Sequence, residues 1–283
     1  MKLTKAIITA AAPGQRKLPL QMLADDDGDL KPAIRIQINE IFGAGIERIG
    51  LVVSAGETAA YQTLLADFGS KIEIMEQPEP LGYGHAVLCA RPFVEDQPFL
   101  LQVCDHLYIS GEEKSCTRQL IETAEHEKCS LSAVEATHES QLSYYGTIGG
   151  GLLRESEGLY RIERVLEKPT PTIAEQQCLV PGLRHGFYLC FFGMHILTPR
   201  ILDILDEHLA GMPGGDRLGL SPALSELQAK ESYLASVLNG RRANLERRFG
   251  YLRAQLALSL NGECRDEILG YMMEELAQSR KGG

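Results

Sequence analysis

A loop of small residues followed by two cations stands near the start of the chain. Residues 10–19 read AAAPGQRKLP. The small side chains of Ala11 and Ala12 leave room for backbone N–H groups to approach a ligand, and Arg16 and Lys17 add positive charge. The P-loop and dinucleotide-binding patterns are both absent. The segment is therefore compatible with a phosphate-binding loop and equally with an ordinary surface turn.

A stiffer segment occupies residues 77–87, which read QPEPLGYGHAV. Two prolines restrict the loop, and Gly82 and Gly84 expose its backbone. The amide of Gln77 offers both donors and an acceptor, so it can read the edge of a nucleobase. A structural turn from strand to helix is the simpler interpretation of the same residues.

A carboxylate follows the apolar run at residues 98–103. Asp105 is placed to hold Mg²⁺ beside phosphate groups, because this ion needs only one or two protein carboxylates there. The neighbouring His106 suits the ion less well, since Mg²⁺ prefers oxygen ligands. Capping of a turn by Asp105 is the structural alternative.

A charged pair closes a further predicted strand, where residues 163–169 read ERVLEKP. The carboxylate of Glu167 can accept hydrogen bonds from sugar hydroxyls, and the ammonium of Lys168 can hold a phosphate. Successive side chains of a strand point to opposite faces, so both reach one site only if the strand end turns. A solvated ion pair is the alternative for these two residues.

The elements that must position these segments alternate along the first half of the chain. Short apolar runs predict strands at residues 6–11, 49–54, 71–75 and 98–103, and helical patterns lie between them at residues 32–43, 57–68 and 84–90. This alternation predicts an α/β fold with a mostly parallel, doubly wound sheet. Ligands of such sheets bind beyond the carboxyl ends of the strands, where the loop after residue 11 and Asp105 stand.

The second half of the chain has fewer predicted helices between its strands. Strands are expected at residues 131–135, 161–166 and 186–192, and residues 249–278 have a helical pattern with Gly270 as the only weak point. We expect one catalytic-type domain at residues 1–248, with residues 249–283 as a helical extension packed on it. The acidic segment at residues 24–30 is expected to be a solvated turn rather than a metal site.

Composition excludes several classes of protein. The 283 residues carry 28 Lys and Arg against 38 Asp and Glu, a net charge of −10. Such an acidic chain is a poor general binder of nucleic acid, and no uncharged run approaches the ~18 residues of a membrane span. The seven cysteines are odd in number and form no C-x-x-C pair. This pattern favours a reducing cytoplasm over a disulfide framework.

Taken together, these segments resemble the bacterial UTP–glucose-1-phosphate uridylyltransferases, also called UDP-glucose pyrophosphorylases. The resemblance rests on four stretches that fit in order and spacing: QPEPLGYGHAVLCAR at residues 77–91, LEKP at 166–169, GMHILTP at 193–199 and GYLRA at 250–254. It implies a glycosyltransferase-A-like nucleotidyltransferase fold, with UTP and glucose 1-phosphate as substrates and Mg²⁺ as the cofactor. A homo-oligomer is compatible with this reading.

The resemblance also implies a role for each matching residue. Ala11, Ala12, Gln77 and the backbone of Gly82 would bind the nucleotide, with uracil read by the last two. Arg16 would contact the triphosphate and Lys168 the sugar phosphate, as the catalytic cations. Gly146 and Glu167 would line the sugar, and Asp105 would hold Mg²⁺.

Departures from the family pattern accompany the matches. Leu20 stands where a phosphate-binding lysine is expected, and Asn244 replaces a second metal-binding aspartate. Ala12 and Gln15 also differ from the family's first loop. We therefore expect either a slow enzyme or a paralogue that binds a uridine nucleotide or nucleotide sugar without turnover. A nicotinamide dehydrogenase would share the fold class but lacks the glycine fingerprint.

Overall fold

The N-terminal half of the chain forms a parallel sheet. The computed structural model describes residues 1–14, 17–154 and 158–279. Four strands lie in the order β5-β4-β1-β6 with parallel register. Their bounds are Ile72–Gln77 for β5, Arg48–Ser54 for β4, Lys5–Ala10 for β1 and Phe99–Val103 for β6. Every residue of β1 is buried, as expected for a strand covered on both faces.

The second half of the sheet mixes both directions. The nine-stranded sheet continues from β6 in the order β11-β8-β12-β10-β9. These strands are β8 (Ser130–His138), β9 (Gly146–Arg154), β10 (Leu159–Glu167), β11 (Phe187–Leu197) and β12 (Tyr233–Val237). Only β8 and β12 pair in parallel here. The α/β class is confirmed, but parallel pairing is confined to part of the sheet. Strands β9 and β10, for example, are joined by too few residues for a helical crossover.

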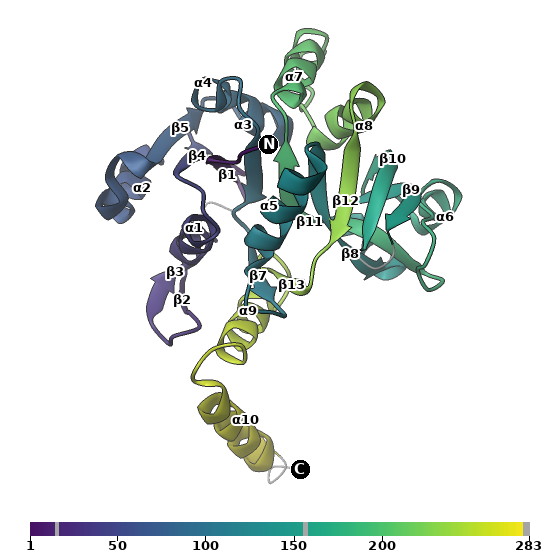
Figure 1. The fold of residues 1–283 in the computed structure, drawn as a ribbon. Coiled ribbons are helices and arrows are strands. Elements are labelled where there is room, and N and C mark those ends of the chain that lie inside the picture. Colours follow the sequence, from purple (N-terminus) through teal and green to yellow (C-terminus); the bar gives the residue numbers. More distant parts are fainter. Residues whose placement is uncertain (15–16, 155–157, 280–283) are drawn as a thin grey trace.

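Helices cover both faces of the sheet (Figure 1). One core contains Ile8 of β1 and buried residues of α1 (Ala33–Gly43), α2 (Thr58–Leu64) and α5 (Cys116–Glu127). The other core contains Ile7 and the opposite helices. These are α3 (Tyr83–Cys89), α4 (Arg91–Val94), α7 (Arg200–Ala210) and α8 (Leu220–Lys230). Alternate side chains of one strand therefore enter two cores. The 3-10 segment η1 (Ala66–Lys71) buries no residue, whereas η2 (Glu139–Tyr144) and helix α6 (Pro171–Gln177) bury Leu142 and Ala174 in a smaller core.

Two small ribbons extend below the main sheet (Figure 1). Strand β7 (His106–Ser110) pairs with β13 (Gly240–Asn244), and β2 (Met22–Ala24) pairs with β3 (Leu30–Pro32). The acidic segment forms the turn of the second ribbon, which confirms the predicted turn, although Asp25 is buried rather than solvated. The Asp25 carboxylate accepts hydrogen bonds there from the backbone N–H groups of Asp27 and Asp29.

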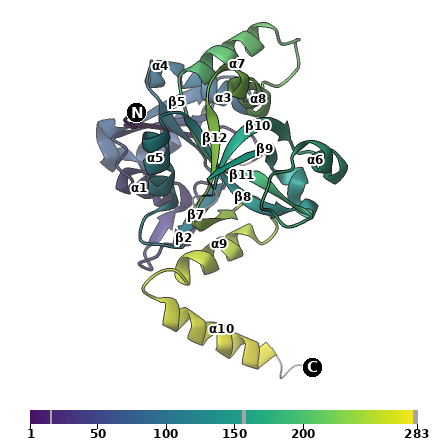
Figure 2. The same ribbon diagram turned by 45° about the vertical axis from the view of Figure 1, so that its right-hand side comes forward.

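The two C-terminal helices differ in how they contact the domain. Helix α9 (Gly250–Ser259) packs on the β7–β13 ribbon through Ala254, Ala257 and Leu258. Helix α10 (Arg265–Ser279) buries no residue, and Figures 1 and 2 show it extending away from the sheet. The expectation that the whole extension packs on the domain is therefore wrong for α10.

The expected helical pattern at residues 249–278 is interrupted, and the break does not fall at Gly270, its expected weak point. It falls at residues 260–264, because Gly262 packs directly against the backbone of Asp26. The N–H of Glu263 donates to the carbonyl of Asp26. This contact between distant segments ends α9.

The cysteines and the lengths of the helices agree with what the composition predicted. All seven cysteines are unpaired. Among the described residues, the longest helices are too short or too polar to cross a membrane.

Candidate active site

One cavity of about 440 Å³ lies at the carboxyl ends of the parallel strands. It adjoins the loop after β1, the end of β5 and the loop after β6. Every predicted site residue that the structure describes lines it: Ala11, Ala12, Gln77, Gly82, Asp105, Gly146, Glu167 and Lys168. Arg16 lies outside the described residues. Segments that are far apart in the sequence therefore form one site, whereas their individual roles stay predictions.

The amide of Gln77 has a fixed orientation at one end of the cavity. Its side chain is buried, and its Nε2 donates to the carbonyl of Gly82 at 2.9 Å. The same Nε2 lies 3.0 Å from Nδ1 of His85. Because the carbonyl can only accept, the atom beside it must be the amide nitrogen, and Nδ1 of His85 must then be the unprotonated acceptor. Both amide hydrogens are used, so Oε1 remains to accept from a ligand.

Close backbone packing holds the Gln77 loop in place. Gly82 adopts φ +110°, and a Cβ there would lie 2.5 Å from the carbonyl oxygen of Leu218. The N–H of Leu218 donates to Leu81, and the N–H of Gly84 donates back to Leu218. Glycine is required at position 82 because both the torsion angle and the contact exclude a side chain. The loop after α7 thus positions the Gln77 segment.

Asp105 lies at the opposite wall, in contact with the segment that follows β13. Its side chain is buried, and its Oδ1 lies 2.8 Å from Nδ1 of His106. Its backbone carbonyl accepts from the N–H of Leu245 at 2.8 Å. This bond brings Asn244 and Glu246 to the cavity, where both line the wall with Asp105. The Oδ1 of Asn244 accepts from the N–H of Glu246 at 2.9 Å.

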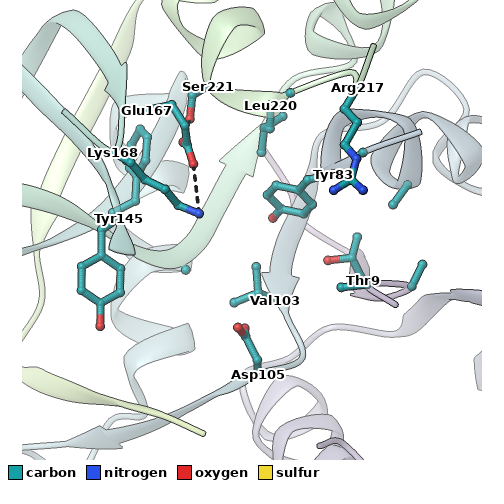
Figure 3. A pocket seen from close by; sticks show the side chains of 18 of the residues that line it. Thr9, Tyr83, Val103, Asp105, Tyr145, Glu167, Lys168, Arg217, Leu220 and Ser221 are labelled. Carbon is teal, nitrogen blue, oxygen red and sulfur yellow. Dashed lines mark hydrogen bonds and ion pairs between the residues drawn. The ribbon is translucent and has the colours of Figure 1, made fainter. Parts of the chain in front are cut away.

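Glu167 and Lys168 both face the cavity, although they are adjacent in sequence. Lys168 adopts φ +45°, a left-handed conformation that ends β10 and breaks its alternation. Its Nζ lies 3.7 Å from the Glu167 carboxylate, and Ser221 donates to the other carboxylate oxygen at 2.5 Å (Figure 3). A non-glycine residue in this conformation is strained, which indicates a specific positional requirement.

Gly146 forms the floor beside this pair. A Cβ there would lie 2.8 Å from the ring of Phe191 and 3.3 Å from the hydroxyl of Ser221. A side chain there would clash first with Phe191 and would also press on Ser221, the partner of Glu167. Glycine therefore leaves space in the cavity beside Glu167 and Lys168.

Several further residues line the cavity that were not predicted as site residues. Figure 3 shows the exposed Arg217 reaching toward Tyr83, near Thr9. Burial raises the pKa of Tyr83 well above its usual value, so its phenol stays protonated. Burial also lowers the pKa of His195 to about 3, and this neutral ring lies 2.6 Å from the hydroxyl of Ser132. Tyr83 and His195 lie within the stretches at residues 77–87 and 193–199, but the sequence pattern assigns neither of them a role, and Arg217 lies in no predicted segment.

Leu20 does not line the cavity. Its side chain is half-buried and packs against the core formed by α1, α2 and α5. The residue expected to be a phosphate-binding lysine is therefore part of the hydrophobic packing. Among the described residues, Lys168 and Arg217 are the cations that line the cavity.

Comparison with known proteins identifies the family. A family model described as nucleotidyl transferase matches residues 16–240. The chain belongs to the nucleotidyl transferase family. The predicted nucleotidyltransferase fold and the resemblance stated above are thereby confirmed.

Curated relatives align over nearly their whole length. A UTP–glucose-1-phosphate uridylyltransferase of Streptococcus pneumoniae is 27% identical, covering 96% of both chains. The uridylyltransferase YngB of Bacillus subtilis is 28% identical, covering 99% of this chain and 98% of its own.

Solved structures of the family superpose well. A UDP-glucose pyrophosphorylase complexed with UDP-glucose is 26% identical, with a TM-score of 0.73, covering 90% of this chain and 98% of its own. A UTP-bound enzyme from Acinetobacter baumannii is 23% identical with the same TM-score, covering 96% and 99%, and supports the fold.

Proposed function

We propose that this protein transfers a uridylyl group from UTP to glucose 1-phosphate, releasing pyrophosphate and UDP-glucose. The observation that carries this proposal is the single cavity that joins the Gln77 amide to the Glu167–Lys168 pair. The names of the curated relatives and of the UDP-glucose complex support it.

Gln77 would select the base through its free amide oxygen. Uracil presents an N3–H donor, whereas cytosine presents an acceptor at the same position. Because both hydrogens of Nε2 are engaged by Gly82 and His85, Oε1 favours a base with an N–H there. The exposed backbone around Gly82 would contact a carbonyl group on the same edge of the uracil ring.

Glu167 and Lys168 would bind the sugar phosphate. The carboxylate, held by Ser221, would accept hydrogen bonds from sugar hydroxyls, and the ammonium would hold the phosphate. The phosphate of glucose 1-phosphate attacks the α-phosphorus in line, and the bond to pyrophosphate breaks. No side-chain nucleophile is needed, so these residues act by positioning and by stabilising charge.

The donor set near Asp105 fits a magnesium ion. Asp105, Asn244 and Glu246 all line the cavity and carry oxygen ligands, and Mg²⁺ bound to nucleotide phosphates needs one or two protein carboxylates. Asp105 and Glu246 would hold the ion. Bound Mg²⁺ would neutralise charge on the phosphates. The carboxylate of Glu246 then offsets the aspartate that Asn244 replaces.

The unpaired cysteines support a cytoplasmic location for this reaction. A pyrophosphate-release assay with UTP, CTP, dTTP and ATP, each paired with glucose 1-phosphate or galactose 1-phosphate, tests the proposal. We expect release to be fastest with UTP and glucose 1-phosphate. Release by no pair, with UTP binding retained in calorimetry, would instead establish a binding paralogue.

A further inference from the structure

A second cavity, of about 360 Å³, adjoins the first and shares Tyr145 and Asn244 with it. It runs along β13, and its other walls come from β8, β11, η2 and α9. Its volume lies within the range of small-ligand sites. Four arginines line it: Arg241, Arg242, Arg247 and Arg253.

The charge balance of this cavity is opposite to that of the whole chain. Glu135 is the only carboxylate among the described residues that line it. The four arginines therefore outnumber acidic groups by three, in a protein with a net charge of −10. Cations gathered in a concave surface create a positive potential that attracts anions.

Arg242 forms the rigid wall of the cavity rather than a free donor. Its side chain is only 4% exposed, and its Nε lies 3.2 Å from the Glu135 carboxylate. Its terminal nitrogens donate to the carbonyl of Phe191 and the hydroxyl of Thr137, and its guanidinium lies 3.6 Å from the centre of the Tyr145 ring. These contacts use all of its nitrogens.

The other arginines keep donors for a ligand. Arg247 donates to Gln141 at 2.8 Å through one nitrogen and lies over the ring of Tyr144, so it is held in place with donors to spare. Arg241 and Arg253 are exposed and form no ion pair with a described residue. Arg241 shares its face of β13 with Ala243, which packs against α9, the helix that carries Arg253.

We propose that this cavity binds a small molecule with two phosphate groups. One phosphate would lie against Arg247, and the other against Arg241 and Arg253, because planar guanidinium forks match phosphate oxygens. The ligand is either inorganic pyrophosphate or a bisphosphorylated sugar. The site uses none of the residues assigned to base, sugar or metal except the shared Asn244, so it stands independently of the proposed reaction.

Calorimetric titration of the full chain tests this proposal. Pyrophosphate and glucose 1,6-bisphosphate are titrated separately, with EDTA present so that no metal-dependent binding contributes. The variants are Arg253→Gln, the double variant Arg247→Gln with Arg253→Gln, and Lys168→Gln as the control in the first cavity. Arg253 is exposed, so its single variant retains the fold even if the double variant is unstable.

We expect one of the two probes to bind the parent protein. Arg253→Gln should weaken it about tenfold, and the double variant more than tenfold, whereas Lys168→Gln should leave it unchanged. The probe that binds more tightly shows whether the ligand is pyrophosphate or a bisphosphorylated sugar. Loss of binding in Lys168→Gln with retention in the arginine variants would place the anion in the first cavity and overturn the proposal. Millimolar titration without binding of either probe to the parent would overturn it too.

Discussion

Replacing His85 with phenylalanine should weaken base discrimination by acting through Gln77. His85 does not line the cavity, but its Nδ1 accepts from the Gln77 amide at 3.0 Å. Without this acceptor, only the carbonyl of Gly82 holds the amide, at 2.9 Å. The Gly82 carbonyl still favours the amide nitrogen beside it, but with one bond in place of two the flipped amide that would suit cytosine is less strongly disfavoured.

The size of this effect follows from the bonds that are lost. A neutral hydrogen bond contributes about 0.5–1.5 kcal/mol net, and 1.4 kcal/mol is one decade. His85→Phe should therefore lower the ratio of kcat/KM for UTP over CTP roughly 2- to 12-fold. Gln77→Ala removes the bond to the base and leaves buried groups unpaired, at about 1–3 kcal/mol, so UTP should bind roughly 5- to 140-fold more weakly.

A double-mutant cycle separates this mechanism from a general disturbance of the helix. If His85 acts only by orienting Gln77, His85→Phe should change nothing in the Gln77→Ala background. Cys89→Ala is the matched control, because its Sγ lies 4.0 Å from the other nitrogen of His85 and should matter less than twofold. If the double variant lowers the kcat/KM ratio for UTP over CTP by the product of the two single effects, the reasoning is refuted. Unchanged UTP affinity in Gln77→Ala would refute it too.

Four further substitutions test the site and the fold. Asp105→Asn should lower pyrophosphate release at least about 10²-fold with unchanged circular dichroism, and parental activity at limiting Mg²⁺ would contradict the metal assignment. Asn244→Asp should lower the Mg²⁺ concentration for half-maximal release, so an unchanged concentration would remove position 244 from the metal site. Leu20→Lys should lower the Tm without raising release, because this side chain packs on the core; faster release would show that it reaches the phosphates. Burial raises the pKa of Glu40 to about 7 from 4.5, so its contribution to stability is complete below about pH 4.5 and is lost as pH rises through 7. Relative to Glu40→Gln, the free energy of unfolding of the parent should fall by at most about 3 kcal/mol from pH 4.5 to 8, and a constant difference in urea melts would contradict this.

The local sequence determined the elements of the first half and the place of the main segments. Apolar runs and helical periodicity predicted β1, β4, β5 and β6 and the helices between them, and burial on both faces explains the continuous runs of β1, β4 and β6. The Gln77 loop and Asp105 follow strands directly, so strand direction alone brings them to one edge of the sheet.

Tertiary structure decided how the second half of the sheet pairs and which residues complete the cavity. A strand's pattern shows that it is buried but not which neighbour it joins or in which direction, so the mixed order around β11 was not predictable. Glu246 lines the same cavity as Asp105 because β13 returns beside β7, and Arg217 enters it because Leu218 pairs with Leu81. Helix α9 ends where Gly262 meets Asp26 rather than at Gly270. Each of these positions depends on a contact between segments far apart in the chain, and such contacts leave no local periodicity for the sequence to display.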